Sequence, residues 1–260
     1  MNRNSAEYWN QPQTEADKPF DVDDSEDKKW LDYARRETNL ETCFRDAVAY
    51  LPALQTTLRG QVFDVCAGVC WASAIVAEHD SVERVDAVDF SEHRMMHLGP
   101  RVIAQYACPA DRIKRICGPV EATLADAQDG NYDFVVFCQA LYMFAKPHPL
   151  LALVHRKLKK GGIVIVACEG IEATPSRTQI LRDEFYAMRH SPRQFLRYHS
   201  ANGWTFAYAP VDESGRHRFT DVQYTRALKR TGFDVARQVL DYPVFPDSGV
   251  NAINYFGIKR

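Results

Sequence analysis

The segment 61–78, QVFDVCAGVCWASAIVAE, constrains the fold of this chain more than any other part of the sequence. Its first residues, 62–65, form an interrupted apolar run that predicts a strand covered on both faces, as in a parallel sheet. Ala67 and Gly68 then form a small-residue turn at which a ligand can approach the backbone, and a helix is predicted to begin near Trp71. This order places a nucleotide-sized ligand at the carboxyl edge of a sheet.

Length and charge limit the classes of protein to which the chain can belong. Its 260 residues suffice for one large α/β domain with spare length for a cap or lid. With 32 basic and 34 acidic residues the formal net charge is -2, which favours a small-molecule substrate over nucleic acid or an anionic membrane. No apolar run approaches the ~18 residues of a membrane span, and the N-terminus lacks the apolar core of a signal peptide. We therefore expect a cytoplasmic protein, and leave its oligomeric state open.

The cysteines give no indication of a metal site. There are seven, an odd number, and most lie in apolar strand-like contexts such as VVFCQ and IVACE, which is typical of reduced core thiols. The spacing of Cys66 and Cys70 is not that of a zinc knuckle, and no Cys/His pair lies nearby in the sequence. We expect no bound metal.

Strand and helix signals alternate through most of the chain. One or two helices are predicted within 28–51. Strands are predicted at 61–65, 82–89, 112–117, 132–138 and 163–168, and the last of these follows an expected turn at Gly161 and Gly162. Ser91 is suited to cap the helix after the second strand. Repeated strand–helix units of this length build a doubly wound parallel sheet.

The C-terminal part departs from this alternation. Thr220 is suited to cap a helix over 221–231 that stops at Gly232. Two strands follow, FDVARQVLDYPVF and NAINYFGIKR, joined by the turn PDSG. Strands with so short a connection pair antiparallel, so the parallel sheet is predicted to end in a reversed hairpin strand.

Four segments together resemble the class I S-adenosylmethionine-dependent methyltransferases, over about residues 28–260. They are DVCAGVCW at the first turn, AVDFSEHRM at the second, YDFVVFCQALYMF at the fourth and LKKGGIVIV before the fifth strand. The resemblance implies a three-layer α/β/α Rossmann-like methyltransferase fold, with a doubly wound, mostly parallel seven-stranded sheet and a terminal antiparallel hairpin strand. It also implies S-adenosyl-L-methionine as the cofactor and methyl transfer to a small molecule as the activity.

The first turn of that family wraps the methionine portion of the cofactor and carries an acidic residue followed by three alternate glycines. Asp64 and Gly68 match this pattern, whereas Cys66 and Cys70 stand at the first and third glycine positions, with Ala67 between them. A Cβ at such a glycine either clashes with the ligand or resists a positive φ, at a cost of ~1–3 kcal/mol. The third position packs the helix against its strand, so Cys66 matters more for cofactor binding than Cys70.

The resemblance assigns further cofactor contacts to the ends of the next strands. Asp89 matches the acidic residue that holds both ribose hydroxyls, because a carboxylate accepts two hydrogen bonds at once. Phe90 matches the apolar residue that packs on adenine. Val120 and Glu121 follow the third strand, where the adenine edge is contacted, and Gln139 leaves the fourth strand beside the methionine end.

Two residues are candidates for catalysis. Tyr142 occupies a position that often bears His in the resembling families, from which it would orient a substrate or help to remove a proton; a hydrophobic wall is the other interpretation. Glu169, just beyond the fifth strand, is expected to point toward the same mouth. General base catalysis by such a group typically contributes ~10² to 10⁴-fold.

Two segments lie outside the core pattern of the single methyltransferase-like domain, 28–260. The acidic segment 1–27 is either a frayed terminus with aromatic anchors or a lid over the ligand. The stretch at about 170–219, rich in arginine and aromatic residues, is either a substrate cap for an anionic or planar molecule or a helical excursion with a solvated basic face.

Three other functions compete with methyl transfer. A nicotinamide-dependent dehydrogenase would require glycine where Trp71 stands, and it would not end in an antiparallel hairpin. A second alternative keeps the cofactor but transfers another alkyl group or closes a ring, which releases methylthioadenosine. The third is a cofactor-binding scaffold without catalysis.

Overall fold

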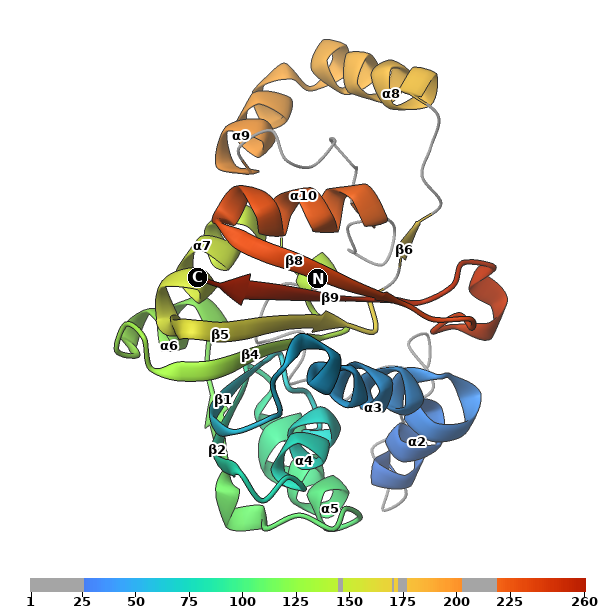
Figure 1. Cartoon of the computed structure of the whole chain (residues 1–260). Helices are drawn as coiled ribbons and strands as arrows, with labels where there is room; N and C mark the ends of the chain where they lie inside the picture. The colour runs from blue at the N-terminus through green and yellow to red at the C-terminus, as the bar shows by residue number, and fades with distance from the viewer. Residues whose placement is uncertain (1–25, 145–146, 170, 173–176, 203–218) are drawn as a thin grey trace.

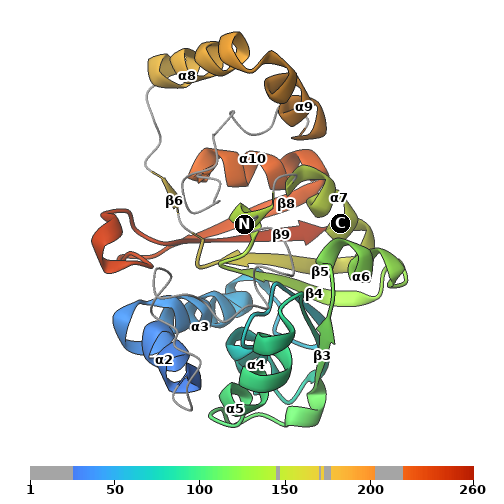
Figure 2. The same ribbon diagram turned by 180° about the vertical axis from the view of Figure 1, so that it is seen from behind.

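Seven strands form one central sheet in the computed structural model, which describes residues 26–144, 147–169, 171–172, 177–202 and 219–260 (Figures 1 and 2). The strands are β1 (Gly60–Val65), β2 (Val82–Asp89), β3 (Ile113–Cys117), β4 (Tyr132–Cys138), β5 (Leu158–Ala167), β8 (Phe233–Val239) and β9 (Ile253–Lys259). Their order is β3-β2-β1-β4-β5-β9-β8; the first five are parallel, and β9 runs antiparallel to both β5 and β8. The predicted fold class is confirmed.

Helices cover both faces of this sheet and create two separate cores. On one face lie α3 (Leu40–Tyr50), α4 (Trp71–Ala77) and α5 (Gly99–Ile103); on the other lie α6 (Val120–Asp126), α7 (Pro147–Lys157) and α10 (Asp221–Thr231). In β4, Phe134 and Val136 enter the first core, and Val135 and Phe137 enter the second. Because successive side chains of a strand point to opposite faces, a strand buried on both faces needs the continuous apolar run seen in the sequence.

Most predicted elements appear where the sequence placed them. The fourth strand has the expected bounds, and α10 ends at Gly232, whose φ of 100° places it in the left-handed region. The expected turn at Gly161 and Gly162 is wrong, because both residues lie inside β5. The register of β4 against β5 shifts there, with Tyr132 paired to Leu158 but Phe134 paired to Ile163. The glycines therefore form a bulge within one longer strand.

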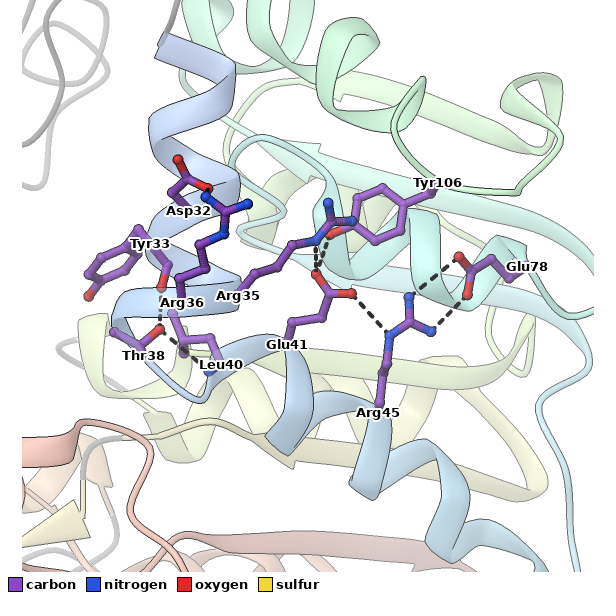
Figure 3. A network of polar contacts seen from close by, with 10 residues as sticks. All are labelled: Asp32, Tyr33, Arg35, Arg36, Thr38, Leu40, Glu41, Arg45, Glu78 and Tyr106. Atoms are coloured by element: carbon purple, nitrogen blue, oxygen red, sulfur yellow. Dashed lines mark hydrogen bonds and ion pairs between the residues drawn. The ribbon is translucent and has the colours of Figure 1, made fainter.

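The N-terminal helices are tied to the sheet layer by a polar network (Figure 3). Two helices, α2 (Glu26–Asp32) and the π-helix η2 (Tyr33–Glu37), precede α3. The Oε2 of Glu41 accepts hydrogen bonds from Arg35 Nε at 2.7 Å and Tyr106 OH at 2.8 Å, and its Oε1 accepts one from Arg45 Nε at 3.1 Å. Arg45 also bonds Glu78, the residue that ends α4, at 2.9 Å. Burial opposes ionisation of Glu41, but these hydrogen bonds outweigh it and lower its pKa.

Between β5 and α10 in the sequence, two helices, α8 (Arg177–His190) and α9 (Pro192–Asn202), lie beyond α10 on the side away from the sheet (Figures 1 and 2). The other described parts of this segment are β6 (Ile171–Glu172) and β7 (Phe219–Thr220), and β6 pairs with β7 in parallel. Leu181, Phe185, Tyr186 and Leu196 are exposed on these helices. The acidic segment 1–27 lies outside the described residues except for its last two, which begin α2.

The remaining short helices of the described residues are one π-helix and four 3-10 helices. The π-helix is η4 (His93–Leu98), and the 3-10 helices are η3 (Leu51–Leu54), η5 (Ala110–Arg112), η6 (Leu141–Met143) and η7 (Pro246–Ser248). Within those ranges, no helix combines the length and the apolar character needed to cross a lipid bilayer.

A glycine in β9 tests how closely the antiparallel strands pack. A Cβ at Gly257 would lie 2.7 Å from Val164 Cγ1 and 2.9 Å from Phe233 Cγ. We expect Gly257→Ala to lower the free energy of unfolding by ~1–3 kcal/mol in urea denaturation, because these side chains must shift. In the control Gly118→Ala the new Cβ meets only Thr123 Oγ1, at 3.6 Å, and we expect a change within ~0.5 kcal/mol. Equal losses in the two variants would contradict this packing.

Candidate active site

Backbone hydrogen bonds join the loops that leave the carboxyl ends of neighbouring strands. The N–H of Ala67, after β1, donates to Val88 O of β2 at 3.0 Å. The N–H of Gly118, after β3, donates to Asp89 O at 2.9 Å, and the N–H of Gln139, after β4, donates to the last carbonyl of β5 at 3.0 Å. The predicted site segments therefore share one edge of the sheet, as expected for a doubly wound fold.

Asp89 ends β2 at this edge, and two backbone donors fix its carboxylate. Its Oδ2 accepts a hydrogen bond from the N–H of Gly68 at 3.0 Å, and its Oδ1 accepts one from the N–H of Ser91 at 2.8 Å. The Ser91 Oγ in turn accepts a bond from the N–H of Arg94 at 3.3 Å, as a helix cap does. A carboxylate has about four acceptor positions, so Asp89 keeps capacity for a ligand.

The turn after β1 has the backbone conformation of a glycine-rich turn although it carries two cysteines. The φ angles of Cys66, Gly68 and Cys70 are 55°, 54° and 65°, all in the left-handed region. Each cysteine therefore bears a strain of ~1–3 kcal/mol. Cys70 is fully buried, with its Sγ 3.7 Å from Met95 Sδ, so it packs α4 against η4. At Gly68 an added Cβ would meet no atom within 4 Å, which shows open space beside the turn.

Asp64 lies behind this turn, against α4. The side chain is 1% exposed, and its Oδ2 accepts a 2.5 Å hydrogen bond from Ser73 Oγ. Burial, together with the charge of Asp89, raises the pKa of Asp64 to about 7 against the effect of the Ser73 bond. The role of Ser73 could not be predicted from the sequence, because a serine within the apolar run WASAIVA gives no indication of which carboxylate it contacts.

Cys66 lies among four of the predicted acidic residues. Burial raises the pKa of its thiol well above the ordinary value, and the charges of Asp89, Glu121, Asp64 and Glu169 raise it further. The thiol is therefore protonated at neutral pH and is a poor nucleophile. All four carboxyl groups therefore act electrostatically on the turn after β1.

The remaining predicted cofactor contacts lie at the same edge with differing exposure. Phe90 follows Asp89 and is half-buried. Val120 is buried at the start of α6, whereas Glu121 beside it is exposed. Gln139 is half-buried and has a φ of 55°.

The structure does not place Glu169 at the mouth of the cleft, where we expected it. The side chain is 2% exposed, and its carboxyl group lies beneath the loop after β4. Oε1 accepts hydrogen bonds from the N–H groups of Ala140 and Leu141 at 2.9 and 2.8 Å. Oε2 accepts one from the N–H of Tyr142 at 3.2 Å and one from Tyr224 OH at 3.1 Å. The prediction that Glu169 points toward a substrate is therefore wrong. Its carboxyl group points into the protein, where it accepts hydrogen bonds from these four donors.

Tyr142 lies in η6 and is 6% exposed, within the core that α10 covers. Its burial agrees with the hydrophobic-wall interpretation, and its backbone N–H is fixed by Glu169. Tyr224, the hydroxyl donor to Glu169, was missed by sequence analysis. Its position on the apolar face of a helix is typical of a core residue and gives no indication of a polar partner.

A family model described as a methyltransferase domain matches residues 63–166, which span β1 to β5 and the predicted residues from Asp64 to Tyr142. The strand order and the antiparallel β9 agree with that match. Residues 63–166 thus match a methyltransferase domain, and the fold of the chain is the Rossmann-like fold of class I methyltransferases. A comparison with curated proteins finds no match.

Solved structures with the same fold come from distant organisms. A Leishmania major S-adenosylmethionine-dependent methyltransferase is 12% identical, with a TM-score of 0.60 over 98% of this chain and 81% of that one. One from Aquifex aeolicus is 13% identical, with a TM-score of 0.54 over 92% and 99%. Haemonchus contortus phosphoethanolamine N-methyltransferase 2, in complex with S-adenosyl-L-methionine, is 15% identical, with a TM-score of 0.55 over 90% and 57%. At these identities the similarity establishes the fold.

The buried carboxyl group of Asp64 gives a prediction for stability against pH. Its folded-state pKa of about 7 lies above the ordinary value of 3.8, so the stability that it contributes is complete at low pH and is lost as pH rises through about 7. Each pKa unit corresponds to ~1.4 kcal/mol, so the loss amounts to a few kcal/mol. We expect Asp64→Asn to flatten this decline in urea denaturation, whereas the exposed control Asp111→Asn keeps it. The pKa of Glu169 is also raised, so Glu169 contributes to the same decline of stability with pH, and each variant is therefore compared with wild type. If stability falls with pH in Asp64→Asn as steeply as in wild type, Asp64 is not the group that titrates.

Proposed function

We propose that this methyltransferase methylates a small molecule, with the cofactor held between the turn 66–70, Asp89 and the loop after β4. The observation that carries the proposal is the carboxylate of Asp89. Gly68 and Ser91 fix it from opposite oxygens, acceptor positions remain, and open space lies beside Gly68. A carboxylate so placed fits the two neighbouring hydroxyls of a ribose.

Side chains next to Asp89 complete the proposed adenosine site. Phe90 would pack on the adenine ring, since it is half-buried directly after β2. Val120 and Glu121 begin α6, next to the end of β2, because Gly118 is bonded to the carbonyl of Asp89. We assign them to the adenine edge.

The charges around Cys66 support the proposed site for the methionine end. The carboxyl groups of Asp64, Asp89, Glu121 and Glu169 all act on its thiol, so this part of the edge is electronegative. Such a field is complementary to the positive sulfonium and ammonium groups of S-adenosylmethionine. The residues present therefore fit the cofactor, with Ala67 and Gln139 contributing backbone to the same wall.

S-adenosylmethionine supplies an activated methyl group on a positively charged sulfur. The protein has to align the acceptor with that group and exclude water, and a strong base is optional. Tyr142 is our candidate for orienting the acceptor, because its backbone is fixed at the end of β4.

The class of acceptor is proposed from the segment 170–219. In its described part, α8 and α9 carry four exposed arginines, Arg182, Arg189, Arg193 and Arg197, beside exposed aromatic residues. Arginine binds planar anionic groups through paired hydrogen bonds, so we infer a small acceptor with an anionic or planar group. The overall net charge of -2 supports this class over nucleic acid.

Replacement of Asp89 tests the cofactor site. We expect Asp89→Ala to weaken S-adenosylmethionine binding by at least ~1.5 kcal/mol, about tenfold or more, because hydrogen bonds to a charged group are lost. Isothermal titration calorimetry measures the change. Glu83→Ala is the matched control, since Glu83 lies exposed at the other end of β2 and should leave the affinity unchanged. Equal affinities of the two variants would remove Asp89 from the site.

The identity of the adenosine product tests the reaction. Purified protein is incubated with S-adenosylmethionine and fractions of anionic small molecules, and the products are identified by mass. We expect S-adenosylhomocysteine together with an acceptor heavier by one methyl group, and we expect less of both with Asp89→Ala at the same cofactor concentration. Methylthioadenosine as the product would contradict methyl transfer, and binding without any turnover across the fractions would contradict the proposed acceptor class.

A further inference from the structure

The loop that leaves β4 has three consecutive backbone N–H groups with a single side chain as their common acceptor. Ala140, Leu141 and Tyr142 donate to Glu169 over distances of 2.9, 2.8 and 3.2 Å. These residues enter η6, and the first N–H groups of a helical turn have no partner within the turn itself. Glu169 supplies that partner from the residues that follow the end of β5.

The contact depends on strained backbone at two strand ends. Gln139, after β4, and Cys168, after β5, have φ angles of 55° and 61°. Their left-handed conformation turns the two loops so that Glu169 faces the residues that follow Gln139. Non-glycine residues rarely adopt this conformation, which the surrounding contacts must therefore maintain.

We propose that Glu169 is a positioning residue for methyl transfer, whose ionised carboxylate holds residues 139–142 as the wall of the methionine end of the cofactor site. The cofactor part of this inference rests on the proposed function. The part that concerns the loop rests on the hydrogen bonds alone.

The ionised form is favoured because three of the four partners of Glu169 in this contact can only donate. These are the backbone N–H groups of 140–142, which share the two carboxyl oxygens with Tyr224 OH. In a protonated carboxyl group the O–H can be accepted only by the Tyr224 hydroxyl among these partners, and a neutral acid accepts more weakly than a carboxylate, so protonation weakens the hydrogen bonds from the backbone. A buried N–H that is poorly paired is costly, and the loop is expected to move to satisfy it.

Burial brings this change of charge close to neutral pH. It raises the pKa of Glu169 to about 7, against the bonds from the loop and from Tyr224, which lower it. Among the described residues, the ionisable groups whose pKa the charge of Glu169 raises are Tyr224 on α10, Tyr255 on β9 and the thiols of Cys66, Cys138 and Cys168 at the strand ends. The pKa values of all five are raised, so they remain neutral at pH 7 and Glu169 is the member of this set that changes charge.

The consequence for binding has a definite sign. Above about pH 7 the carboxylate is ionised and holds the loop; as pH falls through about 7 it is protonated and its hydrogen bonds from the N–H groups of 140–142 weaken. Cofactor affinity is therefore expected to fall on acidification. The free energy of unfolding is expected to change in the opposite direction and to rise on acidification, because a raised carboxyl pKa favours the folded state at low pH. Measuring affinity and stability together therefore separates loop positioning from folding.

Two variants isolate the effect. Glu169→Gln keeps the shape but replaces one oxygen by an NH₂ group, which cannot accept, and it does not titrate. Tyr224→Phe is the matched control: it removes one donor and leaves the three backbone bonds in place. The loss of this donor disfavours the ionised form of Glu169 and so raises its pKa. In Tyr224→Phe we therefore expect Glu169 to hold the loop at high pH, but to lose that hold at a higher pH than in wild type.

The experiment measures hydrogen exchange of the amides of 140–142 in the full chain without cofactor, corrected for intrinsic exchange, alongside S-adenosylmethionine affinity at the same pH values. In wild type we expect protection and affinity to fall about tenfold as pH drops below the pKa, the equivalent of about one hydrogen bond. In Glu169→Gln we expect about tenfold lower protection at high pH and no pH midpoint. In Tyr224→Phe we expect the midpoint to move upward.

The outcomes separate this inference from the proposed function. Wild-type exchange at 140–142 without a pH midpoint, or unchanged protection in Glu169→Gln, overturns the positioning role even if the cofactor binds. Failure of wild type to bind the cofactor, with the amide effects present, refutes the proposed site but supports the hold on the loop. If Glu169→Gln does not fold, the midpoint of Tyr224→Phe decides: an upward shift supports the inference, and no shift overturns it.

Discussion

Hydrogen bonds from backbone N–H groups to buried carboxylates hold the loops at the carboxyl edge of this sheet. Asp89 accepts two such bonds and Glu169 accepts three. Parallel strands end at this edge with backbone groups that the ladder no longer pairs, and burying them without partners would be costly. An acidic side chain at a strand end accepts hydrogen bonds from several donors at once. These hydrogen bonds offset the free-energy cost of burying its charge, and they also order the loops.

The sequence predicted the elements of the fold well because the relevant information is local. A strand buried on both faces requires a continuous apolar run, and such runs identified β1 and β4 directly. Asp89 could be placed because it ends such a run. Cys66 and Cys70 were matched to glycine positions of a known turn, and both have the positive φ that glycine favours.

The predictions that failed depend on contacts between distant parts of the chain. Gly161 and Gly162 resemble a turn, but pairing with β4 draws them into β5 as a bulge. Glu169 follows a strand and was expected to face the ligand, yet the left-handed Cys168 turns the chain so that Glu169 meets the next loop. Its partner Tyr224 is 55 residues away in sequence, and no local pattern relates the two.

The described part of the chain has five non-glycine residues with positive φ, and four of them lie at the carboxyl edge: Cys66, Cys70, Gln139 and Cys168. Their unfavourable torsion angles are imposed when the protein folds, before any ligand arrives. Binding then has few backbone torsions left to restrict, so the entropy lost in forming the complex is small. Folding free energy is in this way converted into preorganisation of the binding surface.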